Sequence, residues 1–322
     1  MLASKAAAVH VGIDMSKAEQ VVHILPSGQH FTLANDAAGR AELVRRLKRL
    51  AVARIVLEPS GSYEQATFKV LRDAGLPVFM VPAEKIRAFA LATRGPLKTD
   101  AIDAQVLAHY AALFEPPVPM PRGALAERLH ELLLLREQFV AWRAAAKCKL
   151  EQACDREARR LLTAEIKHHD GLVARLELRL RALVAADADT ADLCRRLRTA
   201  PGIGELTAFA ILADLPELGR LDRRKIARLV GVAPIARDSG ASKGYRAIHG
   251  GRFRLRRILF MGVLGAVARP NADNSLADFY RRRLNDGAAA KAALVAAINK
   301  LLARLNAMAR DRKDWVDNPL PS

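Results

Sequence analysis

The sequence predicts an α/β N-terminal part followed by a mostly helical remainder, an α/β plus all-α chain of 322 residues. Short apolar stretches alternate with helix-like stretches up to residue 114, a pattern typical of a sheet covered by helices. A proline-rich stretch at 116–122 then precedes long segments rich in Ala, Leu, Arg and Glu. We therefore expect three domains, at 1–120, 121–197 and 198–322.

Five stretches near the N-terminus are expected to be strands, because their apolar residues alternate or run continuously between turn residues. They cover 9–16, 20–26, 30–36, 54–61 and 77–83. The first three follow one another after short turns, which predicts an antiparallel meander. The expected helices cover 37–51, 63–75 and 101–114. This order of strands and helices matches a ribonuclease-H-like fold with a mixed five-stranded sheet.

The segment 122–197 is expected to form long amphipathic helices, since its apolar residues fall near heptad spacing over several turns. Such helices would pair as a hairpin or coiled coil that serves dimerisation or acts as a spacer. After Leu197 the pattern changes to short helices with glycine turns, followed by an alanine-rich helix near 288–311. No apolar stretch is expected to span a membrane, and three cysteines without a CxxC pair favour a reducing, cytoplasmic location.

The net charge of the chain is +18, which indicates a polyanionic partner and most simply nucleic acid. A ribosome-like or membrane-surface protein is the alternative that charge alone leaves open. Between Arg220 and Arg283 there are sixteen Lys and Arg residues but four Asp and Glu residues. We therefore expect the phosphate-binding surface to lie mainly in the C-terminal part.

Four carboxylates fall where the predicted fold can bring them together. Asp14 lies inside the first strand and Glu58 at the end of the fourth, and these strands are neighbours in the expected sheet. Asp100 and Asp103 share one face at the start of the following helix. Such a group repels itself unless divalent cations neutralise it, so it predicts a site for Mg²⁺ or Mn²⁺. Each residue also has an ordinary alternative role, as a helix cap, a first-turn acid or a solvated side chain.

Two C-terminal motifs suggest contacts with a nucleic-acid backbone. The stretch "TAPGIGELTAFAILADL", which begins at Thr199, resembles a helix-hairpin-helix in which Gly202 and Gly204 permit the tight turn. The turn amides and the following helix N-terminus can bind a phosphate without reading bases, although a PGIG turn also joins ordinary helices. The second motif is a group of arginines at the start of an apolar helix, of which some can be solvated or salt-bridged: Arg252, Arg254, Arg256 and Arg257.

Ser239 lies in the glycine-containing loop "RDSGASKGYR", where Arg237, Lys243 and Arg246 supply positive charge. A serine in such a loop is usually a turn residue or a phosphate ligand. The loop contains no ordinary general base, so a nucleophilic Ser239 would need activation by metal ions or by nearby arginines.

Taken together, these motifs resemble the DEDD transposases of a bacterial insertion-sequence family, recombinases that are guided by a structured bridge RNA. In the N-terminal part the resemblance is carried by "GIDMSK", "LEPSGSY" and "LKTDAIDA". In the C-terminal part it is carried by "PGIG", "LVGVAP", "RDSG", "KGYRAIHGGRFRLRRILF" and "FYRRRLNDG". It covers residues 9–113 and 199–310, while the helical middle is similar in position and length only. One departure is Ser60, where members of the family often have threonine, and the change keeps a hydroxyl.

The resemblance implies a RuvC-like N-terminal domain in which Asp14, Glu58, Asp100 and Asp103 bind Mg²⁺ or Mn²⁺. It implies that Ser239 is a nucleophile that becomes covalently joined to DNA, and that the freed DNA hydroxyl later attacks the phosphoserine ester. The expected partners are double-stranded donor and target DNA, a structured RNA, and further copies of the chain as a dimer or dimer of dimers. The acidic and serine motifs then meet within one chain or across subunits, and the resemblance favours the second arrangement.

Two other functions stay open at this point. A RuvC-like nuclease or Holliday-junction resolvase would use a metal-bound water as nucleophile, and Ser239 would be structural. A non-catalytic nucleic-acid-binding protein would carry the carboxylates as surface charges and need no divalent ion.

Overall fold

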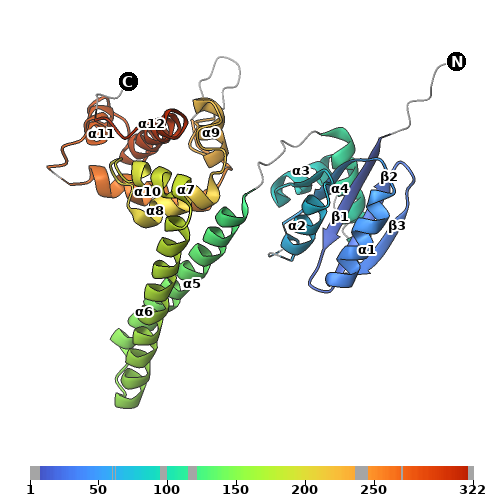
Figure 1. The fold of residues 1–322 in the computed structure, drawn as a ribbon, viewed down its shortest axis with the longest axis horizontal. Helices are drawn as coiled ribbons and strands as arrows, with labels where there is room; N and C mark the ends of the chain where they lie inside the picture. Colours follow the sequence, from blue (N-terminus) through green and yellow to red (C-terminus); the bar gives the residue numbers. More distant parts are fainter. Residues whose placement is uncertain are drawn as a thin grey trace. The chain divides into compact units, whose positions relative to one another are not determined.

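The computed structural model describes residues 8–59, 61, 63–94, 100–114, 122–235, 246–269 and 271–317, without the side chains of residues 94 and 100–102. Contacts divide the chain into two compact units, Met1–Pro119 and Met120–Ser322 (Figure 1). Each unit has its own hydrophobic core.

The N-terminal unit contains a five-stranded mixed sheet in the order β3-β2-β1-β4-β5. The strands are β1 (Val9–Met15), β2 (Glu19–Leu25), β3 (His30–Ala34), β4 (Val52–Leu57) and β5 (Val78–Met80). The first three strands pair antiparallel, whereas β1 with β4 and β4 with β5 pair parallel. The predicted meander and the mixed five-stranded sheet are therefore confirmed.

Helices cover both faces of this sheet. Helices α1 (Ala37–Lys48) and α2 (Gln65–Asp73) pack on one face, over Val11, Ile13 and Leu57. Helices α3 (Ala83–Arg94) and α4 (Asp100–Leu113) form a second core on the other face, with Val56 and Phe79 of the sheet. Because residues alternate between faces along a strand, β4 and β5 contribute to both cores, Val56 and Phe79 to the second and Leu57 and Val78 to the first.

Helix α3 is absent from the sequence prediction, which assigns no helix or strand between residues 83 and 101. The helix starts directly after Pro82, a residue that favours a helix start, and it buries Ile86. Phe89 packs edge-on against Tyr110 of α4, with ring centroids 5.6 Å apart. Helix α3 thereby packs against α4 within the core that both helices form on this face of the sheet.

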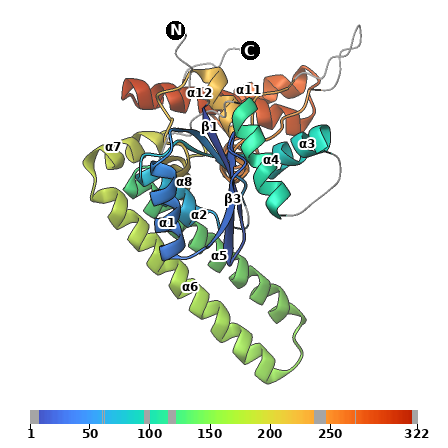
Figure 2. The same ribbon diagram turned by 90° about the vertical axis from the view of Figure 1, so that its right-hand side faces the viewer.

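Helices α5 (Ala124–Gln152) and α6 (Arg156–Ala185) form the predicted helical hairpin (Figure 2). Its two helices run antiparallel, as two ion pairs show: Arg136 binds Glu177 at 2.7 Å, and Arg143, two turns further along α5, binds Asp170 at 2.6 Å. A short connection follows α5, and the Asp155 side chain caps α6 by accepting from the Ala158 amide.

The base of the hairpin belongs to the C-terminal core. Leu133 of α5 and Leu180 of α6 are buried in the same cluster as Phe209 and Leu301. That cluster is formed with α7 (Ala188–Leu197), α8 (Glu205–Asp214), α9 (Arg223–Val230), α10 (Phe253–Val267), α11 (Ser275–Asn285) and α12 (Ala290–Asp311). The segments 121–197 and 198–322 thus share one core, whereas the sequence predicts a boundary between them.

Helix α12, the predicted alanine-rich helix, is long and apolar enough by length and composition to cross a membrane. The expectation that no apolar stretch is long enough to span a membrane is therefore wrong for α12, by length and composition. In the structure one side of α12, which carries Leu301, Leu302 and Leu305, is fully buried in the C-terminal core. Its apolar composition is therefore explained by packing, since a core helix buries a broad apolar stripe of its surface.

Candidate functional site

Asp14 and Glu58 lie on the same face of the sheet, at the ends of two paired parallel strands. Gly12 of β1 pairs with Val56 of β4, and Ile13 pairs with Leu57. Val56 faces the core that α3 and α4 form, whereas Ile13 and Leu57 face the opposite core. Asp14 and Glu58 each follow two residues after Gly12 and Val56, so they continue the α4-covered face. Both residues are half-buried.

Helix α4 lies directly on this face of β1. A β-carbon on Gly12 would come 2.1 Å from the carbonyl oxygen of Ala104 and 2.3 Å from the amide nitrogen of Ala108. Glycine is therefore the residue that allows the strand and the helix backbones to approach this closely. The half-buried Asp103 immediately precedes Ala104 in the helix.

Arg54 fixes the direction of α4. It lies near the start of β4, and its guanidinium donates to the carbonyl oxygen of Ala111 at 3.0 Å, in the last turn of the helix. The C-terminal end of α4 therefore lies near the start of the parallel strands. Its N-terminal end, with Asp100 and Asp103, lies toward the strand ends that carry Asp14 and Glu58.

The opposite end of this face carries His10, which pairs with Leu25 across β1 and β2. Burial, and secondarily the charge of Arg54, lowers the pKa of His10 from its ordinary value. Neither His10 nor Arg54 is predicted by the sequence to contribute to the site. Arg54 contributes to the acidic site indirectly, because its hydrogen bond to Ala111 positions the helix that carries Asp103.

The structure brings three of the four predicted carboxylates to one edge of the sheet: Asp14, Glu58 and Asp103. Asp100 begins α4, but its side chain is outside the described residues. Among the described side chains no three His, Cys, Asp or Glu residues are close enough together to hold a metal ion. The donor chemistry nevertheless suits Mg²⁺ or Mn²⁺, since carboxylate oxygens are the ligands these ions prefer.

The serine loop, residues 236–245, carries Ser239, Arg237 and Lys243, and these three residues lie outside the described part of the chain. Its two ends are described. Ile235 and Ala247 form an antiparallel bridge in which the Ile235 amide donates to the Ala247 carbonyl at 2.9 Å. The bridge brings the loop ends together, and Arg246, at the end of the loop, is exposed.

Arg256 stabilises the segment next to this bridge. Its guanidinium donates to the carbonyl oxygen of Gly231 at 3.1 Å and to that of Gly250. Gly231 and Gly251 both have positive φ, and a β-carbon on Gly251 would lie 2.4 Å from the Gly231 amide nitrogen. The backbone is therefore closely packed where the loop leaves α9 and returns to α10.

Comparison with known proteins assigns both parts of the chain. Residues 11–157 match a transposase model of the IS110 type that is named for a DEDD motif, and residues 194–281 match the model "Transposase IS116/IS110/IS902 family". The chain belongs to the IS110/IS116/IS902 family of transposases. These are DNA strand-transfer enzymes, and the predicted resemblance is confirmed.

Two relatives of this transposase align with most of the chain at low identity. The chain is 25% identical over 318 residues to a "Pilin gene-inverting protein" of Moraxella bovis, which covers 95% of this chain and 97% of the relative. It is 21% identical over 295 residues to the "Transposase for insertion sequence element IS1111A" of Coxiella burnetii, with 81% and 79% covered.

Two of the transposase's predicted nucleic-acid contacts are engaged in ion pairs within the chain. Arg252 binds both carboxylate oxygens of the buried Glu217, at 2.6 and 2.7 Å. Arg254 binds Glu137 at 2.7 Å and also contacts Asp214. Only 18% of the Arg254 side chain is exposed, so its first role is to join α10 to α5 and α8. The sequence shows the clustered arginines but not the acidic residues, which lie far away along the chain.

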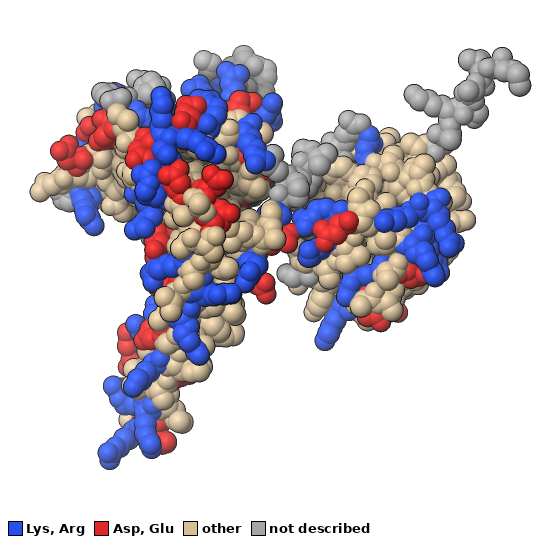
Figure 3. Space-filling view, viewed as in Figure 1, with Lys and Arg blue, Asp and Glu red and all other residues tan. Residues whose placement is uncertain are grey.

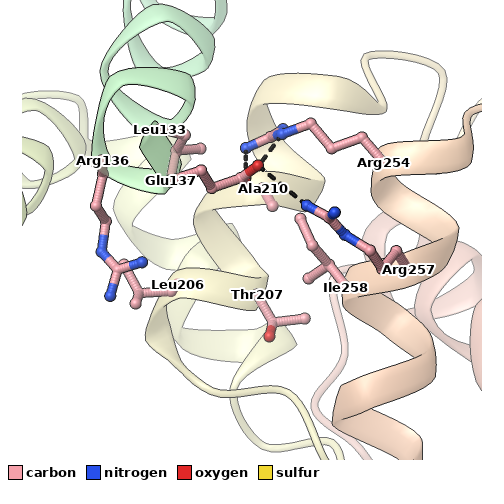
Figure 4. A pocket seen from close by; sticks show the side chains of 9 residues that line it. All are labelled: Leu133, Arg136, Glu137, Leu206, Thr207, Ala210, Arg254, Arg257 and Ile258. Carbon is pink, nitrogen blue, oxygen red and sulfur yellow. Dashed lines mark hydrogen bonds and ion pairs between the residues drawn. The ribbon is translucent and has the colours of Figure 1, made fainter. Parts of the chain in front are cut away.

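Arg257 differs from these two arginines because 60% of its side chain is exposed. It reaches Glu137 at 3.4 Å beside a cavity of about 210 Å³ between α5, α8 and α10 (Figure 4). Thr207 and Arg136 also line this cavity, and Arg136 is itself paired with Glu177. Of the four arginines at the start of α10, Arg257 is thus the most accessible to a ligand.

The glycines of the predicted helix-hairpin-helix have different environments. Gly202 has φ +76° and faces the backbone of Gly262 in α10. Gly204 is the N-cap of α8, is exposed and has no atom within 4 Å of a β-carbon position. The first-turn residue Glu205 binds Arg181 at 2.7 Å. The turn therefore connects α7 to α8 and packs on α10, and its phosphate-binding role stays a prediction.

Proposed function

We propose that this transposase cuts and rejoins DNA through a covalent serine–DNA intermediate, with metal-assisted chemistry in a RuvC-like N-terminal unit. The observation that supports this most is the placement of Asp14 and Glu58 on one sheet face, beneath a helix that begins with Asp100 and Asp103. A ribonuclease-H-like fold with strand order β3-β2-β1-β4-β5 is the architecture that we infer from it.

In the proposed first step the Ser239 Oγ attacks a phosphodiester phosphorus. A serine–phosphate bond forms, the bond from phosphorus to one deoxyribose oxygen breaks, and that oxygen takes up a proton while the serine loses one. In the second step a DNA hydroxyl attacks the phosphoserine ester and restores the serine. One ester replaces another in each step, so the exchange is nearly isoenergetic and needs no ATP.

The carboxylates would support this chemistry through divalent cations. Mg²⁺ or Mn²⁺ bound by Asp14, Glu58, Asp100 and Asp103 would stabilise negative charge on the reacting phosphate and favour the ionised nucleophile. We expect Asp14→Asn to abolish strand cleavage while nucleic-acid binding is retained. Asp73→Asn is the matched control, because Asp73 is an exposed acid of α2 on the opposite side of the sheet. Cleavage at the wild-type rate in excess EDTA would contradict a metal requirement.

The serine is tested by trapping the covalent adduct. A reaction stopped with denaturant should yield a DNA-linked peptide that contains Ser239, as mapped by mass spectrometry. The Ser239→Ala protein should fold and bind nucleic acid but form no adduct, whereas Ser242→Ala, in the same loop, should still form one. An adduct on Ser242, or recombination by Ser239→Ala, would show that the assignment is wrong. Cleavage without any adduct would favour the alternative, a nuclease or junction resolvase that uses water.

Rejoining rather than cleavage alone is favoured by the name of the Moraxella relative, a gene-inverting protein, since inversion requires that cut strands be joined again. RNA guidance is supported by the sequence resemblance and by the positive charge of the C-terminal unit (Figure 3). We expect the purified transposase to carry a specific structured RNA, identified by sequencing. Full site-specific recombination after complete removal of RNA would refute guidance without affecting the serine assignment.

A further inference from the structure

Four cationic side chains gather where α9, α11 and α12 pack together: Arg223, Arg282, Arg283 and Lys300. Helix α12 packs against both α9 and α11. Burial lowers the pKa of Lys300, and the charges of Arg223, Arg282 and Arg283 lower it further, so each of these three arginines lies within electrostatic range of Lys300. We refer to these residues as the cationic cluster.

A small hollow adjoins the cationic cluster. It is a cavity of about 180 Å³ lined by Phe279, Arg282, Arg283, Asn285 and Asp286. The Lys300 Nζ lies 5.4 Å from the centroid of the buried Phe279 ring, so the two residues connect α12 to the lining of the cavity. The cavity thus brings together two guanidinium groups, the Asn285 amide and the aromatic ring of Phe279.

The cluster carries more positive than negative charge. Asp286 lies 3.6 Å from Arg283, and Asp222 beside Arg223 lies 3.3 Å from a further cation, Lys225. Arg282 and Lys300 have additional interactions within the chain. Like charges held this close cost free energy in the protein alone, and a polyanion would offset that cost.

The cluster is also near the serine loop in the fold. Asn299, the neighbour of Lys300 on α12, donates its side-chain amide to the carbonyl oxygen of Val232 at 3.2 Å. Val232 precedes by three residues the bridge residue Ile235, where the loop begins. The helix that carries Lys300 therefore contacts the segment that leads into the loop that carries Ser239.

We propose that the cationic cluster binds a backbone phosphate of nucleic acid and so positions a strand near the serine loop. This inference rests on the proposed function, and it assigns a role to the "FYRRRLNDG" motif that the chemistry above leaves unused. Guanidinium groups suit phosphate oxygens because they donate two parallel hydrogen bonds. The phosphate belongs to the DNA or to the RNA, and the experiment distinguishes these two sources.

The test is the salt dependence of binding by the full-length protein. The probes are a DNA duplex of about 30 base pairs and arbitrary sequence, and an RNA hairpin of about 30 nucleotides. Each lost phosphate contact should reduce the slope of log affinity against log salt by about 1, and reduce affinity about tenfold near 0.1 M salt. We expect this for Arg283→Gln and for Lys300→Gln, and no larger change in slope for the double variant, because both side chains bind the same phosphate.

The matched control is Arg281→Gln. Arg281 lies on the same helix but binds Asp278 at 2.6 Å and the Ala272 carbonyl, so its loss should leave the salt slope unchanged. Because Lys300 also contacts the Phe279 ring, the thermal unfolding midpoint of Lys300→Gln is measured beside its salt slope, and we expect the reduced slope in protein that is fully folded at the temperature of the binding assay. A change with DNA alone, RNA alone or both identifies the source of the phosphate.

Wild-type slopes in both variants, with both probes, would overturn the inference and leave the proposed function intact. Failure of the wild-type protein to bind either probe would instead contradict the proposed function as well.

Discussion

Gly202, in the turn between α7 and α8, packs backbone to backbone against Gly262 of α10. A β-carbon on Gly202 would lie 2.3 Å from the Gly262 carbonyl oxygen, and one on Gly262 would lie 2.4 Å from the Gly202 carbonyl oxygen. Gly202 also has φ +76°, a conformation that residues with a β-carbon rarely adopt. This contact fixes the helix-hairpin-helix-like turn on the helix that begins with the arginine group.

We predict that Gly202→Ala destabilises the C-terminal unit by more than about 2 kcal/mol, since it adds both a steric overlap and a positive-φ penalty. Gly204→Ala in the same turn is the control. Gly204 has φ −78° and open space around it, so its substitution should cost at most about 1 kcal/mol through a weaker helix cap. Thermal or denaturant unfolding measures both effects, and equal costs for the two variants would contradict this account.

The sheet and its acidic residues are predictable from sequence because they depend on local patterns. Apolar stretches of strand length between turns predict β1 to β5, and the strand order then makes the strands of Asp14 and Glu58 neighbours. Helix α3 is not predicted, although Ile86, Phe89 and Ala90 have helical spacing and Pro82 precedes them. Pro82 before the helix and Gly95-Pro96 after it are residues typical of turns, so the sequence pattern favours turns on both sides of this short segment.

The partners of the arginines are not predictable in this way. Arg252 binds Glu217 and Arg254 binds Glu137, which is 117 residues away along the chain. A sequence shows that basic residues cluster but does not show which acidic residues fold against them. The close approach of Gly12 to α4 is likewise a tertiary contact, and a strand glycine alone suggests only a bulge or a close neighbour.

Gly12 offers a test of the acidic site that removes no carboxylate. Its β-carbon position overlaps the Ala104 carbonyl oxygen and the Ala108 amide of α4. We predict that Gly12→Ala moves α4 away from β1, costs about 3 kcal/mol of stability, and reduces cleavage because Asp103 shifts relative to Asp14. Cleavage at temperatures well below the unfolding midpoint separates these effects.

The control for Gly12 is Gly28→Ala, also in the N-terminal unit. Gly28 has positive φ but no atom within 4 Å of its β-carbon position, so its substitution strains the backbone without displacing a helix. We expect Gly28→Ala to lower stability and leave cleavage of folded protein unchanged. Unimpaired cleavage by Gly12→Ala would show that the separation of α4 from β1 does not matter to the reaction.

The α5–α6 hairpin is the surface that we expect to join subunits. Trp142 is 47% exposed and Leu135 41% exposed on α5, and Leu178 is 67% exposed on α6. Large apolar side chains exposed on long helices are typical of interfaces. We predict a dimer or a dimer of dimers by light scattering, which Trp142→Gln with Leu135→Gln weakens. A monomer in the free protein and in an active DNA complex would rule this out.

Asp214 is the centre of the ion-pair group that holds α5, α8 and α10 together. Its side chain is 5% exposed; it accepts from His130 Nδ1 at 2.6 Å and lies 3.3 Å from Arg122, and it also contacts Arg254. Burial alone would raise the pKa of this carboxyl. The hydrogen bond from His130 and the charges of Arg254 and Arg122 outweigh burial, so the pKa of Asp214 is lowered.

A carboxyl whose pKa is lower in the folded than in the unfolded state stabilises the fold above its unfolded pKa of about 3.9, and this contribution is lost as the pH falls through the folded pKa. Asp214→Asn should therefore cost about 3 kcal/mol near pH 7, because it leaves the partly buried Arg254 and Arg122 without their counter-charge. The difference in unfolding midpoint between wild type and variant should stay constant from pH 7 to about pH 5 and shrink below about pH 4. Asp311→Asn is the control, since Asp311 pairs with Arg310 at the exposed end of α12. A difference for Asp214→Asn that is the same at pH 3 and pH 7 would mean that its carboxylate charge does not stabilise this core.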